Sequence, residues 1–349
     1  MDEQEKWSGL LAKAGAVGED AGEKILFEEL LAATKRASVE DVVELLAIIS
    51  ARMESSRHLV RWEVKLHSAI SCAAEQGDAS TLAPLIAQIW PQVEKNYSVS
   101  QCFDQALRIA AHDGWDEGVR LLLNFSSQAH PRSRRSANSE ALESAAHRGR
   151  LGCVEMLIPV SDPLRSFSQA LAMAAEGGQV ECAKALLPHS NPRAAECKAL
   201  KRAAEGGKLA TVELLAPLSS DAQRMEALES AAREGMHDCV AHLRDWHMEQ
   251  NRPGELLRVA ICRGLRKAAL NGQDSCVAAL LPGFKQKDGG IELRDIAMGA
   301  RARGRLSTAK MVDDFARMAE ALAERSLLET EALLTTGATG GPAVGKLRL

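Results

Sequence analysis

Apolar residues recur along this chain with the spacing of amphipathic helices. In residues 141–159 the run A-L-x-x-A-A is followed by a glycine, and four residues after the glycine by C-V-x-x-L. Residues at i, i+1 and i+4 share one face of an α-helix, so the second run predicts a helix with an apolar stripe. The first run predicts a helix whose alanine face admits a close neighbour. Together they predict a helix–turn–helix pair.

The same pattern returns along the chain, each time around a glycine, at Gly77, Gly114, Gly149, Gly178, Gly207, Gly235 and Gly272. The spacing is 28 or 29 residues in the centre and 35 or 37 in the flanks. A glycine after a helix adopts the left-handed conformation that closes it at little steric cost. We expect the second helix to end at Pro159, Pro188, Pro217 and Pro282. Degenerate first and last units are expected around Ala37 and Gly304.

A helix pair of this kind cannot bury its own apolar face, so successive pairs must stack. The sequence therefore predicts an all-α, right-handed α-solenoid of about seven or eight helix pairs. The longer spacings indicate inserted links at residues 125–138 and 245–255.

The recurring A-L-x-x-A-A-x-x-G-x-x-x-C-V-x-x-L-L pattern resembles the ankyrin repeat over roughly residues 65–315, and most strongly over 139–245. Ala174, Ala175 and Gly178 match the family's A-A-x-x-G, and Val212 and Leu215 match its second helix. Only the leucine of the family's T-P-L-H opening is kept, and the central period is shorter than about 33 residues. The resemblance implies that the family's projecting β-hairpin fingers are reduced to tight turns.

This organisation predicts three regions. Residues 1–65 are a helical N-terminal cap or a divergent first repeat, 66–318 the repeat array, and 319–349 a C-terminal helix and a disordered tail from Thr335 onward. The N-terminus lacks a signal peptide, and no run of about 18 apolar residues occurs. We expect a cytoplasmic protein. The short repeats are similar to those of bacterial or viral ankyrin proteins, which leaves delivery into a host cell open.

Composition and charge narrow the class of partner. The 349 residues carry 43 basic and 47 acidic side chains, a net charge of −4, and 3% aromatics. A near-neutral chain lacks the basic surface that nucleic acids require. We expect a monomer that binds neither nucleic acid nor a membrane.

Candidate chemistry is sparse. One position, four residues after the repeat glycine, holds Cys153, Cys182, Cys239 and Cys276, and elsewhere Thr81, Gly118 and Thr211. Stacked helices lie about 8–10 Å apart, beyond the reach of a disulfide, and zinc-ligand spacing is absent, so buried thiols are expected. The scattered histidines form no catalytic set, and we expect no metal, no cofactor and no catalytic residue.

Two further short motifs occur in the sequence. The segment 340–346 fits G-x-x-x-x-G-K, but a phosphate loop continues with Ser or Thr and a helix, and here Leu347 follows. The basic run at 130–136 is interpreted as a solvated loop, with a docking or phosphorylation-sensitive segment as the alternative.

The resemblance also implies where a partner binds, because the two residues before the glycine commonly line the family's groove. Carried over, the candidates are Glu75, Gln76, His112, Asp113, His147, Arg148, Glu176, Glu205, Arg233, Glu234 and Asn271. Arg165, Arg193 and Arg224 are expected in the turns beside them. This mixed-sign surface suits a polar protein partner and offers no preformed pocket for a small molecule.

The function that follows is a non-catalytic scaffold that binds another protein through the concave repeat face. The alternative is that residues 1–70 carry an effector or enzymatic activity and that the array serves for targeting. Loss of activity on deletion of residues 1–65, with partner binding kept, would favour the alternative.

Overall fold

The computed structural model describes residues 3–16, 19–53, 59–93, 97–126, 131–162, 166–193, 198–249, 255–283 and 290–337. Over these ranges the chain is helical and contains no strand. It divides into two compact units, residues 1–199 and 200–349. Each unit is an all-α stack, which confirms the predicted fold class.

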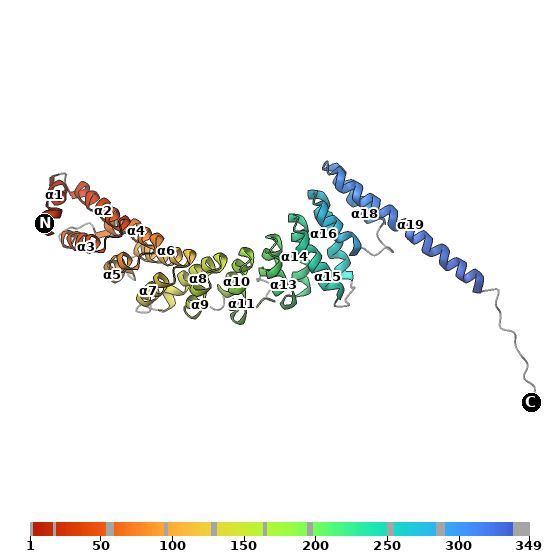
Figure 1. Ribbon diagram of the computed structural model, residues 1–349, viewed down its shortest axis with the longest axis horizontal. Helices are drawn as coiled ribbons and strands as arrows, with labels where there is room; N and C mark the ends of the chain where they lie inside the picture. The colour runs from red at the N-terminus through yellow and green to blue at the C-terminus, as the bar shows by residue number, and fades with distance from the viewer. Residues whose placement is uncertain are drawn as a thin grey trace, which may run out of the picture. The chain divides into compact units, whose positions relative to one another are not determined.

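Unit 1 consists of one leading helix and five helix pairs (Figure 1). The leading helix is α1 (Glu3–Ala16), and the pairs are α2 (Glu19–Lys35) with α3 (Val39–Met53), α4 (Leu59–Gln76) with α5 (Ala79–Val93), α6 (Tyr97–Asp113) with α7 (Asp116–Ser126), α8 (Pro131–Arg148) with α9 (Leu151–Leu157), and α10 (Ser166–Gly177) with α11 (Val180–Leu186). The first helices α2, α4, α6, α8 and α10 contact one another in series, and so do the second helices α3, α5, α7, α9 and α11. Two parallel layers result.

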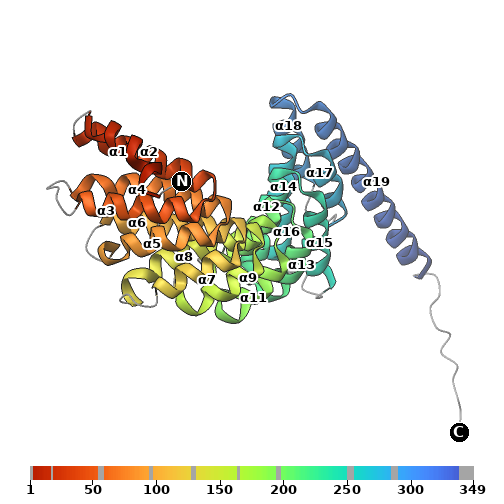
Figure 2. The same cartoon turned by 60° about the vertical axis from the view of Figure 1, so that its left-hand side comes forward.

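Unit 2 repeats this construction (Figure 2). Its pairs are α12 (Ala199–Glu205) with α13 (Leu209–Leu215), α14 (Asp221–Glu234) with α15 (His237–Glu249), α16 (Glu255–Asn271) with α17 (Asp274–Leu280), and α18 (Gly290–Ala302) with α19 (Leu306–Gly337). The first helices α14, α16 and α18 pack in series, as do the second helices α13, α15, α17 and α19. Nine helix pairs therefore occur in the described part of the chain, because both degenerate units form.

The turn inside each pair is closed as the sequence predicts. The glycines at the pattern's centre have φ between 66° and 85°, and Ala37 takes the same place at φ 53°. After α8, the Arg150 amide donates to the Ala145 carbonyl at 2.9 Å; after α2, the Ser38 amide donates to the Ala33 carbonyl at 3.2 Å. The first pair thus has the turn of the other repeats, built on an alanine.

Replacing Ala37 with glycine should raise the free energy of unfolding by about 0.5–1 kcal/mol. The left-handed conformation costs a residue with a side chain roughly 1–2 kcal/mol, and glycine avoids this cost. The greater conformational freedom of glycine in the unfolded chain offsets about 0.4–1 kcal/mol of the resulting gain in stability. Ala47→Gly, on the exposed face of α3, is the matched control and should lower stability by about 0.5–1 kcal/mol. Urea unfolding of the full chain measures the stability of both variants. A loss of stability in Ala37→Gly as well as in Ala47→Gly would contradict the assignment of Ala37 to the glycine position of the repeat.

The core lies between the two layers. The alanine pairs of the first helices, such as Ala145 with Ala146 and Ala174 with Ala175, are completely buried. On the second helices the apolar stripe is buried, as at Val154 and Leu157. The short second helices end just before the predicted prolines, which lie in the 3₁₀ turns η1 (Ile158–Val160), η2 (Leu187–His189), η3 (Ala216–Leu218) and η4 (Leu281–Gly283).

The predicted links are largely helical, which corrects the sequence interpretation. Helix α7 runs to Ser126 and α8 begins at Pro131, so residues 131–136 of the basic run belong to a helix. Proline suits the first turn of a helix, where its missing amide has no partner to lose. In the second link α15 runs to Glu249 and α16 begins at Glu255. Residues 127–130 and 250–254 lie outside the described residues.

Arg224 is also placed differently from the expectation of an exposed turn residue. It lies in α14 with 5% of its surface exposed. Its guanidinium donates to the carbonyl oxygens of Ala216, at 2.8 Å, and Ser219, and pairs with the Asp221 carboxylate. It also lies over the Trp246 ring, 4.1 Å from the centroid. Arg193 is exposed in its turn as expected, and Arg165 lies outside the described residues.

The C-terminal region is partly described. Helix α19 continues to Gly337, so residues 335–337 of the expected tail are helical, and residues 338–349, including the G-x-x-x-x-G-K segment, lie outside the described residues. Among the helices described, none is long and apolar enough to cross a membrane. Domain boundaries near residues 65 and 318 stay predictions.

Candidate partner-binding surface

The first helices of unit 1 enclose an open groove of about 640 Å³. It is lined by Gln105, Arg108 and His112 of α6, by Glu140, Glu143, Ser144, His147 and Arg148 of α8, and by Met173 of α10. Most of these side chains are polar or charged. The groove is wide open rather than enclosed, so it differs from the enclosed pocket that a small-molecule site requires.

Three of the predicted residues are linked by hydrogen bonds, of which His112 and Arg148 line this groove and Asp113 contacts His112. Arg148 Nε donates to His112 Nε2 at 2.8 Å, across neighbouring repeats. Because Nε2 accepts this bond, the imidazole proton lies on Nδ1, which is 2.7 Å from Asp113 Oδ1 and donates to it. The Arg150 guanidinium also donates, through Nε, to the His112 carbonyl at 3.3 Å. His112 is thereby fixed in one tautomer and one orientation.

His147 is held by the next repeat. Its Nδ1 lies 3.3 Å from the Met173 carbonyl oxygen and donates to it. The backbones also approach closely here, because a Cβ at Gly177 would lie 2.2 Å from the His147 carbonyl oxygen. Only glycine permits this approach, so the groove wall between α8 and α10 depends on Gly177.

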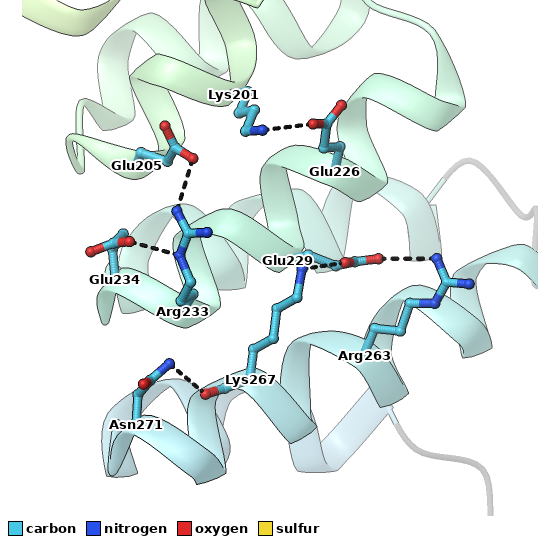
Figure 3. Close-up of polar contacts among 9 residues, drawn as sticks. All are labelled: Lys201, Glu205, Glu226, Glu229, Arg233, Glu234, Arg263, Lys267 and Asn271. Atoms are coloured by element: carbon cyan, nitrogen blue, oxygen red, sulfur yellow. Dashed lines mark hydrogen bonds and ion pairs between the residues drawn. The ribbon is translucent and has the colours of Figure 1, made fainter.

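In unit 2 the corresponding face carries ion pairs between repeats (Figure 3). Arg233 of α14 pairs with Glu205 of α12 at 3.2 Å and with Glu234 at 2.8 Å. Lys201 of α12 pairs with Glu226 of α14 at 2.7 Å. Exposed pairs of this kind contribute at most about 1 kcal/mol each. Their consequence is therefore a fixed pattern of charge rather than stability.

A second carboxylate of α14 pairs with α16. Glu229 lies 2.6 Å from Lys267 Nζ and 3.7 Å from Arg263 Nη1 (Figure 3). Asn271, a predicted site residue, donates to the Lys267 carbonyl of its own helix at 3.0 Å.

The predicted site residues thus do not form one cluster. His112, Asp113, His147 and Arg148 gather at the groove of unit 1, and Glu205, Arg233 and Glu234 gather in unit 2. Gln76 instead donates to the Lys35 carbonyl at 3.1 Å, and Glu75 and Glu176 are exposed at helix ends without lining the groove. Their role in binding a partner stays a prediction.

Sequence reasoning missed the residues one and two helical turns before each predicted position. In unit 1 these are Gln105, Arg108, Glu140 and Glu143; in unit 2 they are Lys201, Glu226, Glu229 and Arg263. They stand six and nine residues before the repeat glycine. Helical periodicity would have found them, because positions four and seven residues earlier share a helix face.

The cysteines of the recurring position are buried free thiols, as predicted. Cys153, Cys182, Cys239 and Cys276 are each at most 1% exposed. Burial raises the pKa of Cys182, Cys239 and Cys276 to about 11. For Cys153, burial and a hydrogen bond to Asp116, with Sγ and Oδ1 3.1 Å apart, raise the pKa to about 12.

These four thiols should react with iodoacetamide at least about a hundredfold more slowly in the native protein at pH 8 than in urea, because the thiolate is the nucleophile. The raised pKa values also mean that the folded state holds protons that the unfolded state releases above its thiol pKa of about 8.5. Stability should therefore fall as the pH rises from about 9 toward 11. Peptide mapping of iodoacetamide-labelled protein measures the labelling rate of each thiol, with half-buried Cys72 as the reference. Fast native labelling of the four would contradict it.

The described residues contain no group of three or more His, Cys, Asp or Glu side chains placed to hold a metal ion. Residues 171–254 match the family model of ankyrin repeats, in three copies. The search of curated proteins finds no match.

Proposed function

Because residues 171–254 of this chain are ankyrin repeats, a module that generally mediates protein–protein interaction, we propose that the chain binds a polar partner protein through the face of its first helices. The observation that carries this proposal is the groove of unit 1, about 640 Å³ and lined by side chains of both charges. A mixed-sign polar surface fits a protein surface of complementary charge.

The mechanism we propose is rigid display. Side chains on the first helices of both units are already held across repeats, as Arg148 is by His112 in unit 1 and Arg233 by Glu205 in unit 2. Side chains that are ordered before binding lose less conformational entropy when a partner docks. They keep contact with solvent as well, since the Arg233 side chain is 47% exposed. A partner can therefore reach them without unfolding the surface.

We further propose that the chain acts as a cytoplasmic, monomeric scaffold without catalysis. The alternative, an effector activity in residues 1–70, has less support. Helices α2 and α3 have the turn geometry of the other repeats, and the Trp7 indole of α1 donates to Glu44 of α3 at 2.6 Å. These contacts favour a role for the N-terminal helices in extending the stack.

Affinity capture from the native lysate tests the proposal. The bait variant Arg108→Ala, His112→Ala, His147→Ala and Arg148→Ala removes the polar groove of unit 1. A matched control changes four exposed residues of the second helices, Glu117, Arg120, Glu155 and Lys184, to alanine. We expect one protein to be captured by the wild type and the control and to be lost by the groove variant, with unchanged circular dichroism in all three.

Equal capture by the wild type and the groove variant would refute this binding face. Loss in the control alone would place binding on the second helices. Deletion of residues 1–65 tests the alternative, since capture that survives the deletion while a biological activity disappears would favour an N-terminal effector.

A further inference from the structure

A small pocket lies between α16 and α18 of unit 2. It measures about 180 Å³ and its wall includes Arg258, Arg263 and Arg266 of α16 and Glu292 and Ile296 of α18. At about 30 Å³ per water molecule it has room for roughly six waters. Sites for drug-sized ligands measure about 300–1,000 Å³. The pocket therefore fits one side chain of a bound protein better than a free small molecule.

The pocket carries a surplus of positive charge. The carboxylate in its wall, Glu292, already accepts a hydrogen bond from the Cys262 thiol, with Sγ and Oε2 3.1 Å apart. Arg263 shares Glu229 with Lys267, which lies nearer to that carboxylate. Arg266 is exposed and makes no ion pair within the described residues. The lining of the pocket thus holds three arginines and one glutamate, which gives it a net positive charge.

The rest of the pocket is apolar. Val259 of α16 and Ile296 of α18 line it, and Ile296 is 2% exposed. A ligand group that fills the pocket must therefore combine a negative end with a short aliphatic stem. Guanidinium groups bind a carboxylate through two parallel hydrogen bonds. A glutamate side chain meets both requirements.

The surroundings oppose a polyanion. Glu226 and Glu229 lie on the neighbouring helix α14, on the same face as Arg263 (Figure 3). A nucleic acid carries one negative charge per about 1.7 Å of duplex and would cross these carboxylates. An isolated acidic side chain in a polar segment avoids them.

We propose that this pocket anchors an isolated glutamate side chain from a polar segment of the partner protein. The proposal rests on the proposed function, since it assumes that a protein docks on the first helices, and it adds the chemistry of the docking segment. Arg258, Arg263 and Arg266 hold the carboxylate, and Val259 and Ile296 contact its stem.

Fluorescence anisotropy on the full chain tests the pocket with a defined probe. The probe is a labelled nonapeptide of glycine, serine and leucine with one central glutamate, and its counterpart has a glutamine there. The pocket variant is Arg258→Gln with Arg266→Gln; the matched control, Arg303→Gln with Arg317→Gln, removes the same charge from exposed sites in the same unit. We expect the pocket variant to raise the Kd of the glutamate peptide at least tenfold and the control to change it less than twofold.

Three outcomes would overturn the proposal. These are no binding of the glutamate peptide to the wild type, an equal loss in the pocket and control variants, and tighter binding of a phosphoserine peptide or a thymidine oligonucleotide. The assay needs no native partner, so it stays informative if the capture experiment fails. The unit 1 groove variant should bind the peptide like the wild type, which separates this pocket from the groove.

Discussion

Arg224→Ala should lower the free energy of unfolding by about 2–4 kcal/mol, the largest effect expected of a polar substitution in this chain. The buried guanidinium donates to two backbone carbonyls at the turn between α13 and α14, and it neutralises Asp221. Alanine removes a donor from both carbonyls, of which that of Ala216 keeps only the long bond from the Ser219 amide at 3.4 Å, and it removes the contact with the Trp246 ring. Part of the loss is offset, because the cost of desolvating the arginine disappears as well.

Urea unfolding of the full chain, followed by tryptophan fluorescence and circular dichroism, measures this effect. Arg224→Lys keeps the charge but loses the planar fork of donors, so it should fall between the wild type and alanine. Arg317→Ala serves as the surface control, because the Arg317 side chain is 73% exposed, and it should change stability by less than about 0.5 kcal/mol. An effect of Arg224→Ala as small as that of the control would show that the buried contacts contribute little.

Ala174→Leu should destabilise the protein by about 2–3 kcal/mol through overpacking. Ala174 is completely buried in α10, a helix packed closely against α8. Three added carbon atoms have no space there, so the two first helices must separate or the leucine must adopt a strained rotamer.

The control for this substitution is Ala87→Leu on the exposed face of α5, which should be nearly neutral. Hydrogen exchange adds a local measurement, because separation of α8 from α10 should expose amides of both helices before the rest of the chain. A neutral Ala174→Leu would mean that the alanine pairs do not set the distance between repeats.

Most of the fold could be predicted because each repeat carries its own complete signal. The alanine pair, the glycine and the apolar stripe lie within a short stretch of sequence, and each acts through local geometry. Even the turn at Ala37, where alanine stands in place of the glycine, was predicted from its position in the pattern, and Ala37 adopts a left-handed φ of 53°. The links were harder to predict, because a spacing of 35 residues does not show whether the extra residues form a loop or, as at Pro131, lengthen a helix.

The lining of the unit 1 groove was predicted in part. The positions before the glycine include His112, His147 and Arg148, but not Arg108 and Glu143, which lie one helical turn earlier. Arg224 was assigned to the surface because arginine is usually exposed and the carbonyls that hold it are not visible in a sequence. Partners that lie in neighbouring repeats cannot be paired from spacing alone.

The sequence by itself determined the all-α class, the helix–turn–helix repeat, the turn positions and the burial of the thiols, because these follow from interactions within a few residues. Only the tertiary structure decided which side chains of the first helices pair across repeats, as Arg233 with Glu205 and Lys267 with Glu229. It also decided that three arginines of α16 converge on a pocket against α18. The physical reason is that stacking sets these distances, and stacking depends on the packing of buried side chains from different repeats.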